Sequence, residues 1–246
     1  MNADEYTNLE QVERSHWYYS GKRELVRYWL KRCGPLRPDQ KLLDCGAGTG
    51  IFAQEISGLC QVSVLDDHEE SIRLLRARFP EDRILRVSGA PIPVADASFD
   101  YLTALDVLEH IEQDRMAVKE FARIVKPGGH VVITVPASMA LWSDWDVALH
   151  HHRRYDKAGL RSIFGAEQWS IEAVNYTNIA AFPAVWAIRH WRCLWARIRR
   201  TNTRLEDVTI PAWVNWVLRR LFVEFGKVSA LPFPFGVSLI LVARRR

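Results

Sequence analysis

A short glycine-rich segment is the strongest candidate for chemistry in the chain. An apolar stretch runs into Asp44, and three glycines then alternate with other residues in the order Asp-Cys-Gly-Ala-Gly-Thr-Gly, residues 44–50. Glycine lets the backbone pass a ligand where a Cβ atom would collide, and a following helix offers free N–H groups in its first turn. We therefore predict a nucleotide-like ligand at Gly46, Gly48 and Gly50. A tight turn without a ligand and a dinucleotide site are the alternatives.

Two carboxylates flank this glycine-rich turn. Asp66 ends the next β-branched stretch, where a carboxylate can accept both ribose hydroxyls of an adenosine. Alternatively, Asp66, Asp67 and His68 simply open the next helix, because acids are favoured at a helix N-terminus. Asp44 stands two residues before the first glycine. A carboxylate there suits the cationic amino end of S-adenosylmethionine (SAM) and suits a pyrophosphate badly.

The elements that must position these residues follow a repeating order. From residue 41 onward, short β-branched stretches alternate with helix-forming ones, which is typical of a parallel sheet with crossover helices. We therefore predict a doubly wound α/β fold. Its seven strands are expected at residues 41–45, 61–66, 83–88, 100–106, 130–136, 170–176 and 237–244. Four helices are expected between them, at residues 52–58, 69–79, 112–125 and 156–164, the third stopped and the chain turned by the Lys-Pro-Gly-Gly that follows it.

The 246 residues are expected to form a single domain, since a chain of this length can bury one core. Apolar residues at helical spacing predict an N-terminal helix within a cap of residues 1–40. The ligand-binding core is expected over residues 41–178, with the final strand in residues 233–246. Residues 179–232 are too many for a loop and predict a helical insert. Its two helices, the first basic and amphipathic, are expected at residues 184–200 and 211–225.

Composition restricts the cellular setting. The four cysteines, Cys33, Cys45, Cys60 and Cys193, show no paired or metal-ligand spacing, as expected in a reducing compartment. The N-terminal residues lack the apolar stretch of a signal peptide, and the longest uncharged runs are shorter than the roughly 20 residues that span a bilayer. We therefore predict a cytoplasmic protein that does not cross a membrane. Residues 179–246 combine 12 Lys and Arg with only 3 acids and half of the ten tryptophans, so basic charge and aromatic side chains coincide there.

Three motifs in a fixed order extend the evidence beyond the glycine-rich turn. They read LLDCGAGTG, SFDYLTALDVLEHI and IVKPGGHVVITVP within residues 41–178. In order and spacing they resemble the class I SAM-dependent methyltransferase family, of methyltransferase type 11/12, in the broad group that also holds quinone-pathway methyltransferases. The run from His151 to Tyr155 resembles a bacterial subgroup with an HxRRY-type motif. The resemblance implies a Rossmann-like, mostly parallel sheet with an antiparallel last strand.

The resemblance also implies which residues bind SAM and its product S-adenosylhomocysteine. The glycine-rich turn would hold the methionine part, the acid after the second strand the ribose, and the backbone after the fourth strand the amino-acid end. Many members place an acid after the third strand to hold the adenine, whereas this chain reads Ser-Gly-Ala there, so backbone or hydroxyl contacts would serve. The implied binding residues are Asp44, Gly46, Ala47, Gly48, Gly50, Asp66, Asp67, Ser88, Gly89, Ala90, Leu105 and Asp106.

Candidates for catalysis cluster after the fifth strand. Methyl transfer from a sulfonium is an in-line displacement, so the enzyme mainly aligns the acceptor, and a base helps where the acceptor is a hydroxyl or an acidic carbon. His151 and Tyr155 lie in a segment that such folds place over the cofactor, and we predict them as catalytic residues. The alternative is a solvated structural turn whose arginines bind carboxylates.

A candidate metal set precedes this run. Asp106, Glu109 and His110 combine two carboxylates with an imidazole, which suits a divalent ion. Some quinone-pathway and small-RNA methyltransferases carry a similar Glu-x-x-Glu-His that holds a metal. Many metal-free relatives also carry Leu-Glu-His at this point, and we predict no metal.

Together these features predict a SAM-dependent methyltransferase that moves a methyl group to O, N or C of a small, apolar or amphipathic acceptor. A SAM-binding scaffold or regulator that transfers no methyl group, and a nucleotide-dependent oxidoreductase, are the alternatives. The insert predicts a helical cap over the acceptor pocket or a homodimer contact. Alternatively, its tryptophans and arginines contact a membrane surface and admit a lipid-like acceptor. A nucleic-acid partner is not expected, because no basic track with interleaved aromatics lies near the cofactor.

Overall fold

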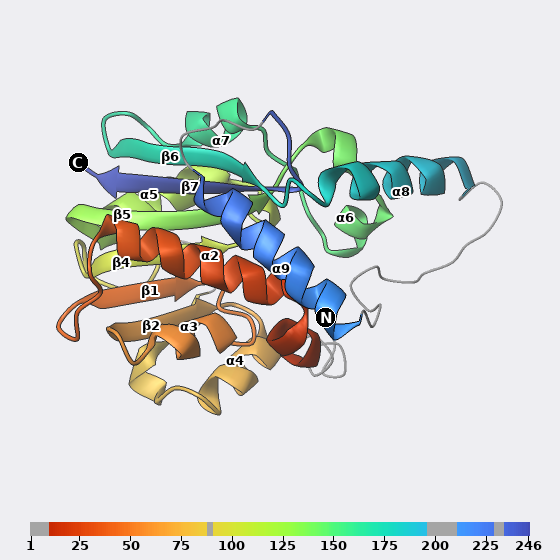
Figure 1. Ribbon diagram of the computed structural model, residues 1–246. Coiled ribbons are helices and arrows are strands. Elements are labelled where there is room, and N and C mark those ends of the chain that lie inside the picture. The colour runs from red at the N-terminus through yellow and green to blue at the C-terminus, as the bar shows by residue number, and fades with distance from the viewer. Residues whose placement is uncertain (1–9, 88–90, 196–210, 229–233) are drawn as a thin grey trace.

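The computed structural model describes residues 10–87, 91–195, 211–228 and 234–246, and its strands form one seven-stranded sheet (Figure 1). Neighbouring strands are parallel except at β7, which pairs antiparallel with both β5 and β6. The predicted fold class is therefore confirmed. The spatial order is β3 (Ile84–Arg86), β2 (Gln61–Asp66), β1 (Lys41–Cys45), β4 (Phe99–Leu105), β5 (Val125–Pro136), β7 (Ser238–Arg245) and β6 (Trp169–Thr177).

The order of the strands fixes where a ligand binds. From β1 the chain first builds outward through β2 to β3 and then crosses back to β4 on the other side of β1. In doubly wound sheets the ligand lies outside the carboxyl ends of the strands where the order reverses. The turns after β1, β2 and β4 therefore border the candidate site.

Helices cover both faces of the sheet because successive strand residues point to opposite sides. Leu42 and Val132 pack in a cluster with four helices, and their neighbours Leu43 and Val131 pack in a second cluster with two others. The first face carries α2 (Trp17–Cys33), α3 (Ile51–Ile56), α4 (Glu69–Arg76) and α9 (Ala212–Lys227). The second carries α5 (Asp114–Ile124) and α7 (Lys157–Ile163).

The two helices of the predicted insert lie in different places. Helix α9 packs along α2, and a Cβ atom on Gly226 would lie 2.5 Å from the Leu25 Cδ2 atom, so the missing side chain permits this close approach. Helix α8 (Phe182–Trp195) extends beyond the carboxyl ends of the parallel strands, beside α6 (Asp144–Ala148) (Figure 1). The last five residues of the predicted helix 184–200 lie outside the described residues. None of the described helices combines the length and apolarity needed to cross a bilayer.

Several local features differ from these expectations, and helix α4 ends at Arg76, three residues before its predicted end. Strand β3 ends at Arg86, two residues early. Strand β5 begins at Val125, which pairs with Phe99, five residues before its predicted start. The Lys-Pro-Gly-Gly segment was expected to turn the chain. Instead it lies within β5, where the pairing with β4 has an irregular register. Helix α6 was not predicted, although Ser143 and Asp146 form a capping box that marks its start.

Candidate active site

The glycine-rich turn has a backbone that side-chain-bearing residues rarely adopt. The φ angles of Gly46, Gly48 and Gly50 are 65°, 55° and 76°, all in the left-handed region. A Cβ atom on Gly46 would lie 2.5 Å from the Val107 Cγ2 atom, so this glycine brings the turn against the end of β4. A Cβ atom on Gly48 would meet no atom within 4 Å. Gly48 therefore borders open space, which a ligand can use.

Asp66 holds the turn to the end of β2. Its Oδ2 atom accepts the backbone N–H of Gly48 at 2.9 Å, and its Oδ1 atom accepts that of His68 at 3.0 Å. Its side chain is buried, whereas Asp67 is exposed. A carboxylate offers about four lone-pair sites, so two acceptor sites stay available for a ligand. The geometry thus gives Asp66 a structural role beside its predicted role in binding ribose.

Asp44 is a buried carboxylate at the end of β1. It is 2% exposed, and its Oδ1 atom accepts a hydrogen bond from the Thr103 hydroxyl at 2.6 Å. Burial is the main cause that raises the pKa of Asp44 to about 7, and the nearby charges of Glu13 and Asp66 also raise it. The hydrogen bond from Thr103 acts in the opposite direction and lowers the pKa. A cationic group placed beside Asp44 would favour its charged form.

The N-terminal segment contacts the glycine-rich turn. Residues 10–15 are helical, and Glu13 accepts a hydrogen bond from the Thr49 hydroxyl at 2.5 Å. The guanidinium of Arg78 donates to Glu10 at 2.5 Å, and that of Arg23 donates to the Glu13 carbonyl at 2.6 Å. These contacts place the predicted N-terminal cap directly beside the turn.

Asp106, directly after β4, pairs with α2. Its Oδ2 atom lies 2.5 Å from the Lys22 Nζ atom, and its Oδ1 atom accepts from the Thr134 hydroxyl at 2.9 Å. Burial alone would raise the pKa of Asp106, but Lys22 overcomes this and holds it below the usual value. Asp106 also has a φ of 57°. Such strained non-glycine residues are concentrated at functional sites, and Ser138 and Asn178 share this backbone after β5 and β6.

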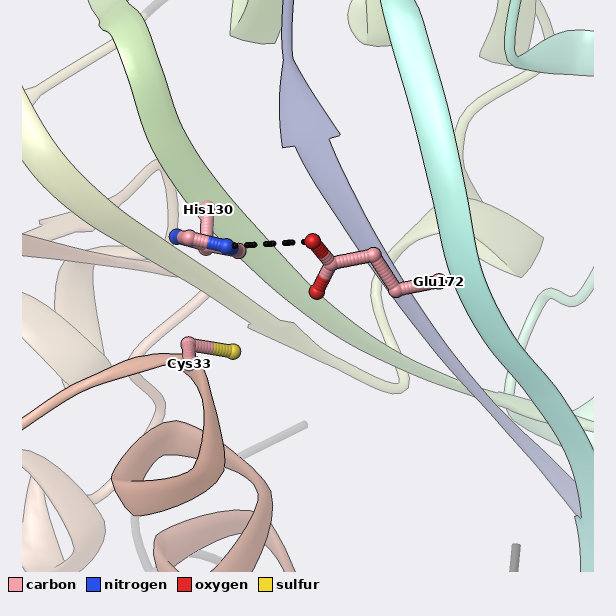
Figure 2. A group of neighbouring side chains, drawn as sticks. All are labelled: Cys33, His130 and Glu172. Atoms are coloured by element: carbon pink, nitrogen blue, oxygen red, sulfur yellow. Dashed lines mark ion pairs between the residues drawn. The ribbon is translucent and has the colours of Figure 1, made fainter. Parts of the chain in front are cut away.

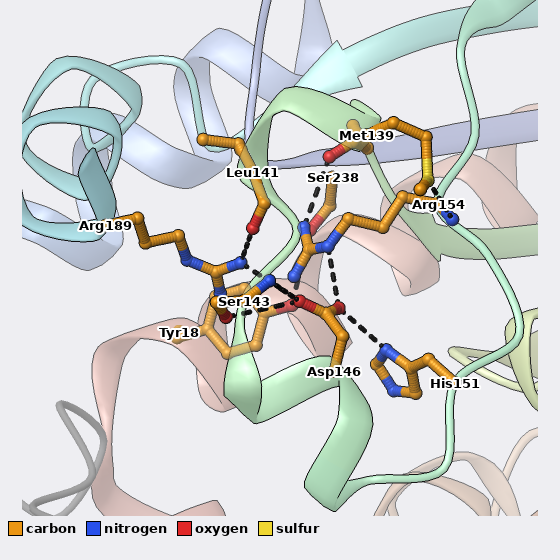
Figure 3. A network of polar contacts seen from close by, with 10 residues as sticks. Tyr18, Met139, Leu141, Ser143, Asp146, His151, Arg154, Arg189 and Ser238 are labelled. Carbon is orange, nitrogen blue, oxygen red and sulfur yellow. Dashed lines mark hydrogen bonds and ion pairs between the residues drawn. The ribbon is translucent and has the colours of Figure 1, made fainter. Parts of the chain in front are cut away.

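His151 belongs to a buried network around Asp146 (Figure 3). Its Nδ1 atom lies 3.0 Å from one Asp146 oxygen, and the Arg154 Nε atom donates to the same oxygen at 2.7 Å. Burial would raise the pKa of Asp146, but His151 and Arg154, with Arg189, lower it to about 2. The ionised Asp146 favours the proton on Nδ1 of His151. The other ring nitrogen is then free to accept a proton.

Tyr155 lies in a separate buried network. Its hydroxyl donates to the Asp114 carboxylate at 2.9 Å and to the Leu108 carbonyl at 3.2 Å, and burial with Asp114 raises its pKa. Arg153 also pairs with Asp114, at 2.8 Å. The arginines of this run bind carboxylates, as expected if the run is a structural turn. The run is not a solvated turn, however, because Arg154 and Tyr155 are buried. The catalytic role of Tyr155 stays a prediction.

Glu109, His110 and His151 form a candidate metal set, with one ligand atom from each within 4.8 Å of the others. Glu109 is 1% exposed, and neither carboxylate oxygen has a hydrogen-bond partner among the described residues. Burial and the charge of Asp106 raise the pKa of Glu109 well above its usual value, whereas burial and His151 lower that of His110 to about 4. These residues could hold a divalent ion, so the predicted absence of a metal stays a prediction.

The fold brings most of the predicted binding residues to one edge of the sheet. The glycine-rich turn with Ala47, Asp44, Asp66, Leu105 and Asp106 lie at the ends of β1, β2 and β4. Ser88, Gly89 and Ala90 lie outside the described residues. Sequence reasoning missed Lys22, Glu13 and Thr103 at this edge. The apolar residues at helical spacing predicted helix α2, but they did not predict that its polar side chain Lys22 contacts Asp106 at the site.

Together these observations define a doubly wound α/β protein with a glycine-rich turn and buried carboxylates at the carboxyl edge of its sheet. Residues 43–133 match the family described as "Methyltransferase domain". A "probable S-adenosylmethionine-dependent methyltransferase" of Mycolicibacterium smegmatis is 27% identical over 165 residues, 65% of this chain and 62% of that protein. A demethylmenaquinone methyltransferase of Corynebacterium urealyticum is 34% identical over 111 residues, 44% of this chain and 47% of that protein. A SAM-dependent methyltransferase structure from Thermotoga maritima has a TM-score of 0.61 at 14% identity, covering 99% of this chain and 96% of that one.

The resemblance to class I SAM-dependent methyltransferases that the sequence motifs predicted is thus confirmed over residues 43–133, while the HxRRY-type motif in the run from His151 to Tyr155 stays a prediction. The match to the M. smegmatis protein covers less than two thirds of that protein's length. The structural likeness, at 14% identity, shows the fold alone.

The Asp146 network yields a prediction for stability. Asp146→Asn should destabilise the fold by about 3–5 kcal/mol at pH 7, because it leaves buried Arg154 and His151 without their carboxylate. The pKa of Asp146 is lowered in the folded state, so its contribution is complete above about pH 4 and is lost as the pH falls toward 2. Urea denaturation at several pH values checks this. Asp144→Asn, an exposed change on the same helix, is the control; equal losses in both variants would contradict the account.

Proposed function

We propose that this chain transfers a methyl group from SAM to O, N or C of a small, apolar or amphipathic acceptor. The observation that carries the proposal is the glycine-rich turn at Gly48, which borders open space between the ends of β1 and β2 and is held by Asp66. The similar proteins named above support the same cofactor, since the relative from M. smegmatis is named a probable SAM-dependent methyltransferase.

The residues at this edge fit SAM by charge and shape. The missing side chain at Gly48 leaves room for the methionine part, and the buried carboxylate of Asp44 suits its cationic amino group. The remaining acceptor sites of Asp66 suit the ribose hydroxyls. The backbone of Leu105 and Asp106 would contact the amino-acid end. When bound, SAM supplies an electrophilic methyl group on a sulfonium; the protein binds, aligns and excludes water.

His151 is our candidate for taking a proton from the acceptor. Asp146 orients the ring through Nδ1 and stabilises the imidazolium that forms on protonation, which is the role of the carboxylate in a Ser-His-Asp triad. Since a His110 pKa of about 4 keeps that ring neutral at pH 7, it does not add a repelling charge beside His151. Because burial raises the pKa of Glu109, this side chain does not act as a second buried anion that would compete with Asp146 for His151.

The two alternative functions are less well supported. A pyrophosphate-bearing dinucleotide would meet the carboxylate of Asp44 at the turn, with no arginine or lysine of the described residues bonded to it. A scaffold without transfer activity would not require an oriented Asp146–His151 pair.

The outward face of α9 supports contact with a membrane surface and hence a lipid-like acceptor. Trp213 and Trp216 are 71% and 65% exposed, and Val217 and Leu221 continue the same face at helical spacing. Tryptophan is favoured at the boundary between head groups and acyl chains. Arg220 on the same helix can contact anionic head groups.

The ribose contact yields a prediction for binding. Asp66→Ala should weaken SAM binding by about 10- to 100-fold, the loss expected for a hydrogen bond to a charged group. Calorimetric titration measures the change, and circular dichroism checks that the fold is intact. Asp82→Ala, which removes an exposed acid, is the control. Unchanged affinity in Asp66→Ala would refute the ribose assignment.

Activity is tested with labelled methyl groups. The protein and methyl-labelled SAM are incubated with metabolite and lipid extracts, and label should pass to an acceptor. With that acceptor, His151→Gln should lower kcat by about 10²- to 10⁴-fold, the usual effect of removing a general base, with SAM binding unchanged. No transfer to any extract would argue for the scaffold, and an unchanged kcat would refute the base assignment.

The membrane contact is tested by co-sedimentation with vesicles of mixed neutral and anionic phospholipid. The protein should pellet at low salt, and Trp213→Ala with Trp216→Ala should release most of it, because both exposed rings are lost. Met116→Ala is the control, since it removes an exposed apolar side chain from α5 on the other face of the sheet. A protein that stays in solution at low salt would contradict the proposal.

A further inference from the structure

A second cluster of ligating side chains is drawn in Figure 2, and its place before β1 and near the start of β4 puts it at the opposite end of the sheet from the glycine-rich turn. Cys33 is the last residue of α2, His130 lies in β5 beside Tyr101 of β4, and Glu172 lies in β6. One thiol, one imidazole and one carboxylate atom lie within 4.8 Å of one another. The site assigned to SAM uses none of these residues.

A β-bulge brings Glu172 into the cluster. Ile171 pairs with Ala243 and Ala173 pairs with Val242, so Glu172 is an extra residue opposite β7. A bulge re-aims the side chain of the extra residue, and bulges are concentrated beside functional sites. The Glu172 Oε1 atom thereby lies 3.5 Å from the His130 Nε2 atom, although β7 lies between their strands.

The chemical types of the three side chains indicate which metal ion they would bind. A thiolate, an imidazole and a carboxylate are the three donor types of zinc sites, and three protein ligands leave one position for water. A cavity of about 560 Å³ is lined by all three residues and gives water access. We propose that Cys33, His130 and Glu172 bind a Zn²⁺ ion with an open fourth position.

The charges around the cluster are compatible with a divalent ion. Burial and Glu172 raise the pKa of the Cys33 thiol to about 12, and its S–H donates to the Trp29 carbonyl at 3.2 Å. Zn²⁺ therefore displaces a proton when it binds. The resulting thiolate and Glu172 balance the two charges of the ion, so the loaded site is neutral beside Arg32 and Arg244, and Arg37 on the same cavity pairs with Asp39. Lys126, also on the cavity, is already paired with Asp100.

The ion would fasten the end of α2 to β5 and β6. The same helix carries Lys22, whose ammonium pairs with Asp106 at the other end of the sheet. A fixed helix end therefore supports the position of Lys22. Because the ion binds only the folded chain, saturating Zn²⁺ should raise the melting temperature.

The test uses the full, untagged chain after removal of metals by a chelator. Titration with Co²⁺ alone should give one bound ion per chain with thiolate-to-cobalt absorption in the near ultraviolet, and Zn²⁺ should displace it. Cys33→Ser should abolish that absorption. Glu172→Gln, a change at a partly exposed position, should lower the affinity for cobalt by at least about 10-fold. Changes to residues that only contact a metal ligand already cause a loss of this size.

Cys60→Ala is the matched control, since Cys60 is buried outside the cluster and its loss should leave the absorption unchanged. His110→Gln tests whether the cobalt binds instead at Glu109, His110 and His151. The proposal is wrong if no thiolate absorption forms, if the absorption survives Cys33→Ser, or if cobalt binding is lost in His110→Gln and kept in Cys33→Ser.

Discussion

One buried carboxylate holds the geometry on which the rest of the active edge depends. Asp66 accepts the N–H groups of Gly48 and His68, and so fixes the turn after β1 against the turn after β2. With the turn fixed, the open space beside Gly48 faces the ends of both strands. The left-handed backbone of the turn excludes most side chains, which explains why glycines occupy three of its positions.

The remaining charges of the site are buried in pairs. Lys22 of α2 neutralises Asp106, and Arg154 with His151 neutralises Asp146. An unpaired charge at these depths would be costly, so each pair ties a helix or loop to the sheet edge. Asp44 and Glu109 are exceptions among the described residues, since neither pairs with a cation and burial raises the pKa of both. The region where an acceptor would lie is thus built from fixed, mostly neutralised groups.

The sequence predicted the sheet well because its signals are local. Short apolar stretches and the glycine-rich turn located β1 and β2 to the residue, and helix α5 was located within two residues. The tertiary pairings were not predictable: Lys22 is 84 residues from Asp106, and Glu172 reaches His130 only through a bulge. The bulge leaves no local signal, since Glu172 occurs in an otherwise ordinary alternating strand. Helix α6 had a readable capping box at Ser143 that was overlooked.

The central claim is that a SAM-type nucleoside lies across the ends of β1 and β2. A crystal structure of the chain with S-adenosylhomocysteine tests it most directly. We expect density for the amino-acid tail beside Gly48 and Asp44, and ribose hydroxyls within hydrogen-bond distance of the Asp66 carboxylate. Density for the nucleoside at any other place, or a turn closed against it by residues 10–15, would contradict the account.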